Sequence, residues 1–121
     1  MRTSMVIGLL LASVGAVAAQ VSAQDSTGNV EKGKAIYQKH CLRCHGPAGD
    51  GRGPDANDLI VPPKNFQSPQ SRAKSEFELL VILSNGVIFS PMHSWRDKLN
   101  QTEMLDVIRY IRTLAPSQST F

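Results

Sequence analysis

The chain has 121 residues, of which 13 are Lys or Arg and 10 are Asp or Glu, giving a formal net charge of +3. This length allows one domain. So small a charge, without a basic run interleaved with aromatic residues, argues against nucleic-acid binding.

The first 23 residues have the pattern of a secretory signal peptide. Arg2 supplies a positive start, residues 6–19 carry no charge, and small residues lead up to Ala18 and Ala23. Either alanine fits a small-x-small cleavage site, and we favour cleavage after Ala23. The uncharged run is shorter than the roughly 20 apolar residues of a membrane span. We therefore expect an exported, periplasmic domain over residues 24–121, whereas an uncut leader would tether that domain to the membrane.

A helix is predicted to begin after Asn29, which is a good N-cap. One face of it carries residues at helical spacing: Val30, Gly33, Tyr37 and Cys41. Gly33 costs up to about 1 kcal/mol relative to alanine inside a helix, so it predicts a close packing partner. The solvated face carries Lys32, Lys34 and Lys39, and His40 is expected at the surface or at an edge.

Residues 41–45 read Cys-Leu-Arg-Cys-His and contain the only two cysteines of the chain. This spacing is the attachment signature of c-type haem. Each thiol adds to one vinyl group of the porphyrin, and one turn of backbone can reach both. We therefore expect Cys41 and Cys44 to hold the haem covalently and His45 to be the proximal iron ligand. A buried porphyrin would also supply apolar interior that so small a domain lacks.

Two other kinds of site use cysteine pairs, and both fit less well. A thiol redox pair is expected within a βαβ unit and leaves His45 without a role. A zinc site needs a second pair of ligands at similar spacing, and only His40 and His93 remain.

Residues 46–71 are rich in Gly, Pro, Asp and Asn, which excludes a long helix or a central strand. The spaced glycines Gly49, Gly51 and Gly53 do not form a phosphate loop, because no strand precedes them and no Lys-Ser/Thr follows. We expect a loop that wraps the proximal side of the haem. One of its carbonyls should accept a hydrogen bond from the outer ring nitrogen of His45, and the sequence does not say which.

A short helix is predicted after Ser75, which forms a capping box with Glu78. Its apolar side is assigned to Phe77, Leu80, Val81 and Leu83. Gly86 should end it in a left-handed conformation.

Residues 87–95 are apolar, contain a proline and have neither a helical nor an alternating period. A methionine often fills gaps in a core, but its thioether is also a suitable sixth ligand for haem iron. We favour Met92 as the distal ligand. Its competitor is His93, and because neighbours in an extended segment point opposite ways, only one can face the iron. Trp95 is expected to pack on the haem with its indole N–H near a propionate.

The last predicted helix has Asn100 as N-cap and Glu103 three residues later. Its apolar face is marked by Met104, Val107, Ile108, Ile111 and Leu114. Arg109 and Arg112 are expected on the other face, and Pro116 stops the helix.

Four stretches in this order resemble class I cytochromes c. They are Gly33 with Tyr37, the haem motif followed by Gly46, Pro91-Met92 followed by Trp95, and Val107 with Tyr110 and Ile111. The resemblance covers about residues 30–114. It implies an all-α cytochrome c fold, with three to four helices wrapped around one covalent haem and a long Gly/Pro-rich loop. In this family the first and last helices cross near the matching Gly and Tyr positions, and many relatives have Pro where this chain has His93.

This ligand set predicts an electron carrier rather than an enzyme. His and Met together saturate the iron and tend to raise its reduction potential. The expected partners are larger redox proteins, a donor dehydrogenase or reductase and an acceptor oxidase or reductase. The alternatives are a membrane-tethered haem subunit of a respiratory or dehydrogenase complex, and a haem sensor or enzyme with a labile Met92.

Overall fold

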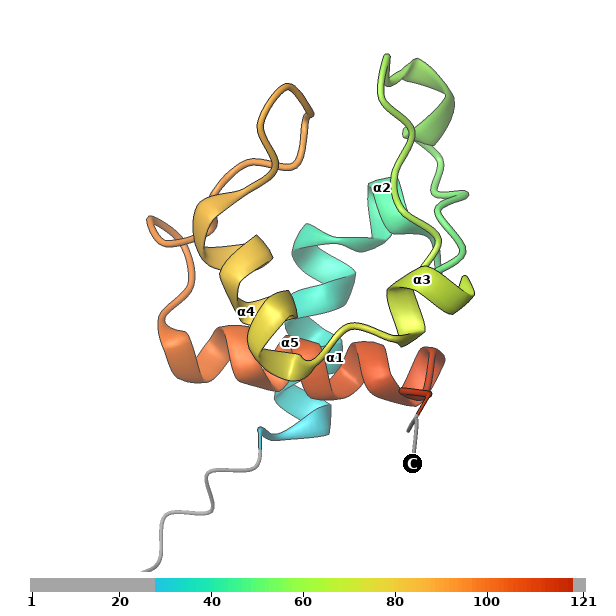
Figure 1. Cartoon of the computed structure of the whole chain (residues 1–121). Helices are drawn as coiled ribbons and strands as arrows, with labels where there is room; N and C mark the ends of the chain where they lie inside the picture. Colours follow the sequence, from blue (N-terminus) through green and yellow to red (C-terminus); the bar gives the residue numbers. More distant parts are fainter. Residues whose placement is uncertain (1–27, 119–121) are drawn as a thin grey trace, which may run out of the picture.

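The computed structural model describes residues 28–118, and over that range the chain is helical and has no strand. The elements are α1 (Val30–His40), α2 (Leu42–His45), the 3-10 turn η1 (Ala56–Asp58), α3 (Pro69–Arg72), α4 (Glu76–Asn85) and α5 (Gln101–Leu114). Figure 1 shows α1 crossing α5, with α4 on one side and α2 with its following loop on the other. The all-α prediction is confirmed. Of the five α-helices, α2 and α3 have only four residues each, so three longer helices carry the fold.

The predicted signal peptide, residues 1–23, lies outside the described residues. Among residues 28–118, every helix is too short or too polar to pass through a bilayer.

The crossing of α1 and α5 depends on Gly33. A methyl group at this position would collide with the backbone carbonyl of Asp106 on α5. The buried Asp106 carboxylate in turn accepts a hydrogen bond from the Asn29 backbone N–H at 2.5 Å. The close partner that Gly33 predicted is therefore the backbone of the last helix. Asn29 also caps α1 as predicted, its side chain accepting from the Lys32 N–H at 2.9 Å.

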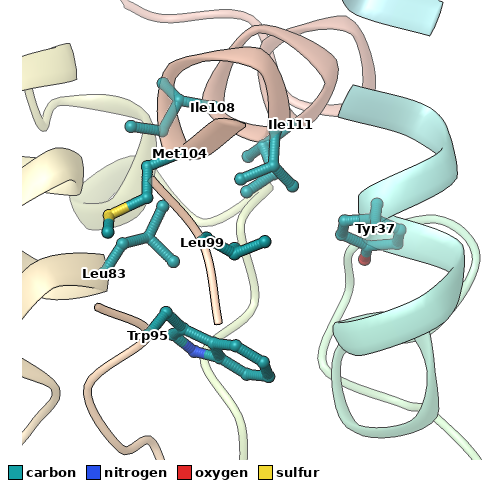
Figure 2. Packing of buried hydrophobic residues seen from close by; sticks show 8 residues of the cluster. Tyr37, Leu83, Trp95, Leu99, Met104, Ile108 and Ile111 are labelled. Atoms are coloured by element: carbon teal, nitrogen blue, oxygen red, sulfur yellow. The ribbon is translucent and has the colours of Figure 1, made fainter. Parts of the chain in front are cut away.

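The apolar core lies where α4, α5 and the segment before α5 meet α1. Its members are Tyr37, Leu83, Trp95, Leu99, Met104, Val107, Ile108 and Ile111. In Figure 2 the side chains of Leu83, Met104 and Ile108 lie together, and Trp95 stands at the edge of the cluster. The predicted α5 face is confirmed, with Leu114 half-buried at its end. The opposite-face prediction holds only in part, because Arg109 and Arg112 are both half-buried. Arg109 pairs with Glu76 at 2.9 Å, and Arg112 donates to the Lys74 carbonyl.

The predicted apolar side of α4 is wrong in part. Leu83 is buried and Leu80 packs against the core, but Phe77 is 73% exposed and Val81 is 39% exposed. The helix is apolar on nearly all sides, so its sequence pattern did not distinguish the side that meets α5 from the side that faces outward.

The predicted capping box of Ser75 with Glu78 at α4 is confirmed, and the predicted N-cap Asn100 forms a capping box with Glu103 at α5. Gly86 ends α4 as predicted, but with φ 72° and ψ −170° rather than in the left-handed helical conformation. A Cβ there would come within 2.7 Å of the Met92 carbonyl oxygen. The positive φ and this close approach explain the glycine.

Candidate haem site

The motif residues lie on a single turn at the end of α1. Cys41 ends α1 and begins α2, and its N–H donates to the Tyr37 carbonyl at 2.8 Å. The His45 N–H donates back to the Cys41 carbonyl at 2.9 Å. Both thiols are free and half-buried. One helical turn therefore presents two thiols and an imidazole together, as covalent haem attachment requires.

The Cys41 thiol does not have the character of a redox-active cysteine. Burial, with a smaller effect of Cys44, raises the pKa of the Cys41 thiol to about 12. Cysteines that carry out thiol–disulfide exchange have lowered pKa values, because the thiolate is the reactive form. The described residues also contain no βαβ unit. Both findings argue against thiol redox chemistry.

The loop that follows binds the backbone of the motif. Three of its N–H groups donate to the motif's carbonyls: Gly51 to His45 at 2.9 Å, Gly53 to Cys44 at 3.1 Å and Asp55 to Arg43 at 2.9 Å. These bonds satisfy carbonyls that the end of a helix leaves unpaired. The loop thus holds the attachment turn in one place, and the prediction of a loop over residues 46–71 needs only the addition of η1 and the start of α3.

His45 is held by two residues of this loop. Its Nδ1 lies 3.2 Å from the Lys64 carbonyl oxygen, and its ring stacks on Phe66 with centroids 4.4 Å apart and an interplanar angle of 18°. Because a carbonyl can only accept, the proton is on Nδ1 and the lone pair on Nε2 is available. Burial lowers the pKa of His45, against an opposing effect of the Lys64 carbonyl, which favours the neutral imidazole that binds metals. The predicted loop carbonyl is that of Lys64.

The segment between α4 and α5 is irregular but closely hydrogen-bonded. The Val87 N–H donates to the Met92 carbonyl at 2.7 Å, and the Met92 N–H donates to Ser90 Oγ at 3.1 Å. Ser94 Oγ donates to the Ser84 carbonyl at 2.6 Å, so the end of α4 is tied to the residues after Met92. Met92 itself is half-buried and packs against the core.

Two mostly apolar segments, which also contain Asp58 and Ser90, line an open hollow of about 410 Å³. Residues 58–61 line one side and residues 89–91 the other. Ile60 is fully exposed and Phe89 is 97% exposed, and Ile88 beside it is also mostly exposed. Side chains of this size are normally covered, so the hollow has the character of a site for an apolar group. Figure 1 shows the two segments projecting from the same end of the molecule.

Trp95 carries a buried hydrogen-bond donor that has no partner within residues 28–118. Its indole is buried, yet Nε1 has no hydrogen-bond partner among the described residues. A buried indole N–H normally has one. Two free thiols, exposed apolar side chains and an unpaired indole donor have the chemistry that suits a porphyrin, which is apolar across its plane and carries carboxylates at one edge.

His93 and His40 lie against the same indole. The His93 ring centroid is 4.4 Å from that of Trp95, and the His40 centroid is 5.3 Å from it. His93 is exposed, and its Nδ1 donates to the Ser94 carbonyl at 2.7 Å. His40 is half-buried rather than simply at the surface, because it packs edge-on against Trp95.

Sequence reasoning missed Phe66, and it placed Phe89 in the apolar distal segment without predicting that its side chain would be exposed. Phe66 could have been found, because it is the only aromatic residue in the polar stretch 46–71. Phe89 has a φ of 59°, unusual for a bulky residue, and no sequence signal marks that conformation.

The helical fold and the Cys-x-x-Cys-His turn at the end of α1 are those of a small c-type cytochrome. Residues 28–111 match the family described as cytochrome c oxidase, cbb3-type, subunit III, and the chain belongs to that family. It accordingly carries covalently bound haem c with iron. A search of curated proteins gave no match.

Solved structures agree with this assignment. A chain of the Kuenenia stuttgartiensis reducing HAO-like protein complex Kustc0457/Kustc0458 is 25% identical, with a TM-score of 0.65 over 71% of this chain. This chain spans only 43% of that one. The KustC0563 c-type cytochrome is 24% identical, with a TM-score of 0.56 over 69% of this chain and 96% of its own. Cytochrome c6 from the diatom Phaeodactylum tricornutum is 20% identical, with a TM-score of 0.57 over 73% of this chain and 95% of its own. The last two likenesses show the fold alone.

Proposed function

We propose that this cytochrome is an exported single-electron carrier whose haem is held by Cys41 and Cys44 and ligated by His45 and Met92. The observation that carries the proposal is the fixing of His45. Its Nδ1–H is occupied by the Lys64 carbonyl at 3.2 Å and its ring is stacked on Phe66, which leaves Nε2 as the free ligand atom. A histidine prepared in this way directly after two free cysteines is a proximal haem ligand.

The distal assignment is supported by the two neighbours in the methionine segment. Met92 is half-buried and packs inward, whereas His93 is exposed and already bonded to the Ser94 carbonyl. Haem ligated by histidine and methionine supplies a reversible one-electron centre of raised potential. The thioether of Met92 lies on a hydrogen-bonded segment, so little of the protein has to move when the charge changes. This favours a carrier over a sensor or enzyme with a labile methionine.

Carbon monoxide binding tests the carrier function directly. A saturated iron has no open position, so the reduced protein should bind carbon monoxide poorly near neutral pH and show negligible peroxidase turnover. It should instead exchange electrons quickly with a larger redox protein, at a rate that varies with ionic strength if charged side chains guide docking. Rapid stoichiometric binding of carbon monoxide by the native reduced protein would overturn the carrier function.

The proposed location is the periplasm, and the proposed partners are a donor dehydrogenase or reductase and an acceptor oxidase or reductase. The proposal rests on the signal-peptide pattern of residues 1–23 and on covalent haem attachment, which belongs to an exported, oxidising compartment. Sequencing the N-terminus of periplasmic material should find Gln24.

A subunit role is the second candidate. The description of the matching family names an oxidase subunit. One similar structure is a protein complex, and the match covers 43% of the similar chain in it. Sedimentation of the native protein separates the two candidates. A free carrier sediments as a small particle, whereas a subunit remains with a larger assembly or with the membrane fraction.

A further inference from the structure

The indole of Trp95 is enclosed by basic side chains from two parts of the chain. His93 lies 4.4 Å from it between ring centroids, with the planes tilted by 36°. His40 meets it edge-on at 5.3 Å, and Lys98 Nζ lies 5.5 Å from the ring centroid. Haem attachment and iron ligation, as proposed above, use none of these contacts.

His93 is fixed in this position by its own backbone. Its Nδ1–H donates to the Ser94 carbonyl at 2.7 Å, so turning the ring away would break that bond. His93 is exposed and Trp95 is buried, so the imidazole covers part of the indole from solvent. His93 is therefore placed to restrict the indole rather than to approach the iron.

His40 restricts the same ring from the other part of the chain. It is the last residue of α1, directly before Cys41, so its contact joins the attachment turn to the methionine segment. The backbone of Trp95 is fixed as well, because its N–H donates to the Leu83 carbonyl at 2.9 Å. Backbone and ring are thus both held, and Nε1 points in one direction.

That direction matters because Nε1 is buried and has no partner among residues 28–118. Leaving such a donor unpaired is costly, so a fold that holds it rigidly implies an acceptor. The carboxylates at the porphyrin edge are acceptors of the right chemistry. A donor there offsets negative charge near the iron, which favours the reduced state.

We propose that His93 and His40 are positioning residues, which hold Trp95 so that its Nε1–H reaches a haem carboxylate and thereby raise the reduction potential. The inference rests on the proposed haem site and goes beyond it by assigning a task to the two histidines that do not bind iron. It also accounts for the residue that this chain has after Met92, where many class I relatives have proline.

The test uses the fact that the chain has one tryptophan. In the reduced, haem-loaded protein labelled with ¹⁵N, the indole gives one N–H resonance, whose exchange with solvent can be followed together with the midpoint potential. His93→Ala and His40→Ala should each speed indole exchange by about tenfold. This is the change expected when the free energy of the local opening that exposes the indole N–H falls by about 1.4 kcal/mol. The midpoint potential should fall in both variants.

Two further variants separate positioning from a general loss of structure. His93→Phe keeps a flat ring against the indole but lacks the N–H that bonds the Ser94 carbonyl, so exchange and potential should recover only in part, to values between those of His93→Ala and wild type. Arg96→Ala truncates an exposed side chain next to Trp95 without removing a ring, and should leave indole exchange unchanged. Circular dichroism and the far-red Fe–S band, measured on every variant, verify that the fold and the ligation are retained.

The results have distinct meanings. Wild-type exchange and potential in both alanine variants would overturn the inference, and so would equal shifts in His93→Ala and His93→Phe. Absence of the far-red band from the wild type would overturn the ligand assignment instead, while indole exchange would still report whether the histidines hold Trp95.

Discussion

The Tyr37 hydroxyl donates a hydrogen bond of 2.7 Å to the carbonyl of Gly46. The bond joins the middle of α1 to the residue directly after His45, and both of its atoms are buried. Burial is the main cause that raises the pKa of Tyr37 far above its usual value, so the hydroxyl keeps its proton and remains a donor. The bond therefore fixes the end of the haem motif against the first helix.

Replacing Tyr37 by Phe should lower stability without displacing the haem. The substitution removes one of two hydrogen bonds to the buried Gly46 carbonyl, which also accepts from the Gly49 N–H at 3.2 Å, and should cost about 0.5–1.5 kcal/mol. Urea unfolding, followed by circular dichroism, measures the change. Tyr110→Phe is the matched control, because Tyr110 packs beside Tyr37 with centroids 5.2 Å apart and is only half-buried. An equal loss in both variants would contradict a specific role for the Tyr37 hydroxyl.

Replacing Gly33 by Ala should separate α1 from α5. The added methyl group would overlap the Asp106 carbonyl, which belongs to backbone and cannot move aside as a side chain could. We expect a loss of about 1–3 kcal/mol or more in the free energy of unfolding. Lys34→Ala, at the exposed neighbouring position, should change stability by less than about 0.5 kcal/mol. A stable Gly33→Ala protein would mean that the two helices do not cross as closely as described.

The haem should be covalent through Cys41 and Cys44. In acidified organic solvent the colour should stay with the polypeptide, because thioether bonds survive this treatment and axial ligation does not. The double variant Cys41→Ala with Cys44→Ala should lose stable haem retention. Free extraction of haem from the wild type would refute the covalent attachment.

Met92 rather than His93 should bind the iron. In Met92→Ala the Fe–S charge-transfer band in the far red should vanish and the reduction potential should fall, since the thioether is lost. His93→Ala should keep the band, because its ring is bonded to Ser94 and packed on Trp95. Loss of the band in His93→Ala, with retention in Met92→Ala, would exchange the two assignments.

The sequence predicted best where one residue type has one physical use. Gly33 predicted a close partner, the capping residues Ser75 and Asn100 predicted helix starts, and the apolar period of α5 predicted its buried face. Each signal depends on chemistry within a few residues of the chain. The cysteine pair followed by His45 is of the same kind.

The sequence predicted less where contacts join distant parts of the chain. Nothing near His45 indicated that Lys64 would supply the carbonyl or that Phe66 would stack on the ring. The prediction that Phe77 lies on the packed side of α4 failed for a related reason. On a helix as apolar as α4, periodicity does not reveal which side meets α5, and tertiary packing alone decides.

His40 should make stability depend on pH. Burial, followed by the charges of Lys39 and Lys98, lowers the pKa of His40 below its ordinary value of 6.5. The groups that face it are therefore these two lysines and the uncharged Trp95 ring. Unfolding restores the ordinary pKa, so between the two values the unfolded chain binds more protons than the folded chain. The free energy of unfolding should then fall as the pH drops through 6.5, and this contribution should level off below the folded pKa. Glu78, whose pKa is lowered from 4.5 by hydrogen bonds from Ser75, titrates below this window and does not obscure it.

Urea unfolding of the haem-loaded protein from about pH 5 to about pH 8 measures the dependence. His40→Phe keeps an aromatic ring against Trp95 but cannot titrate, so the decline below pH 6.5 should be smaller in this variant than in the wild type. Equal pH dependence in the two proteins would show that His40 titrates as freely in the folded chain as in the unfolded one.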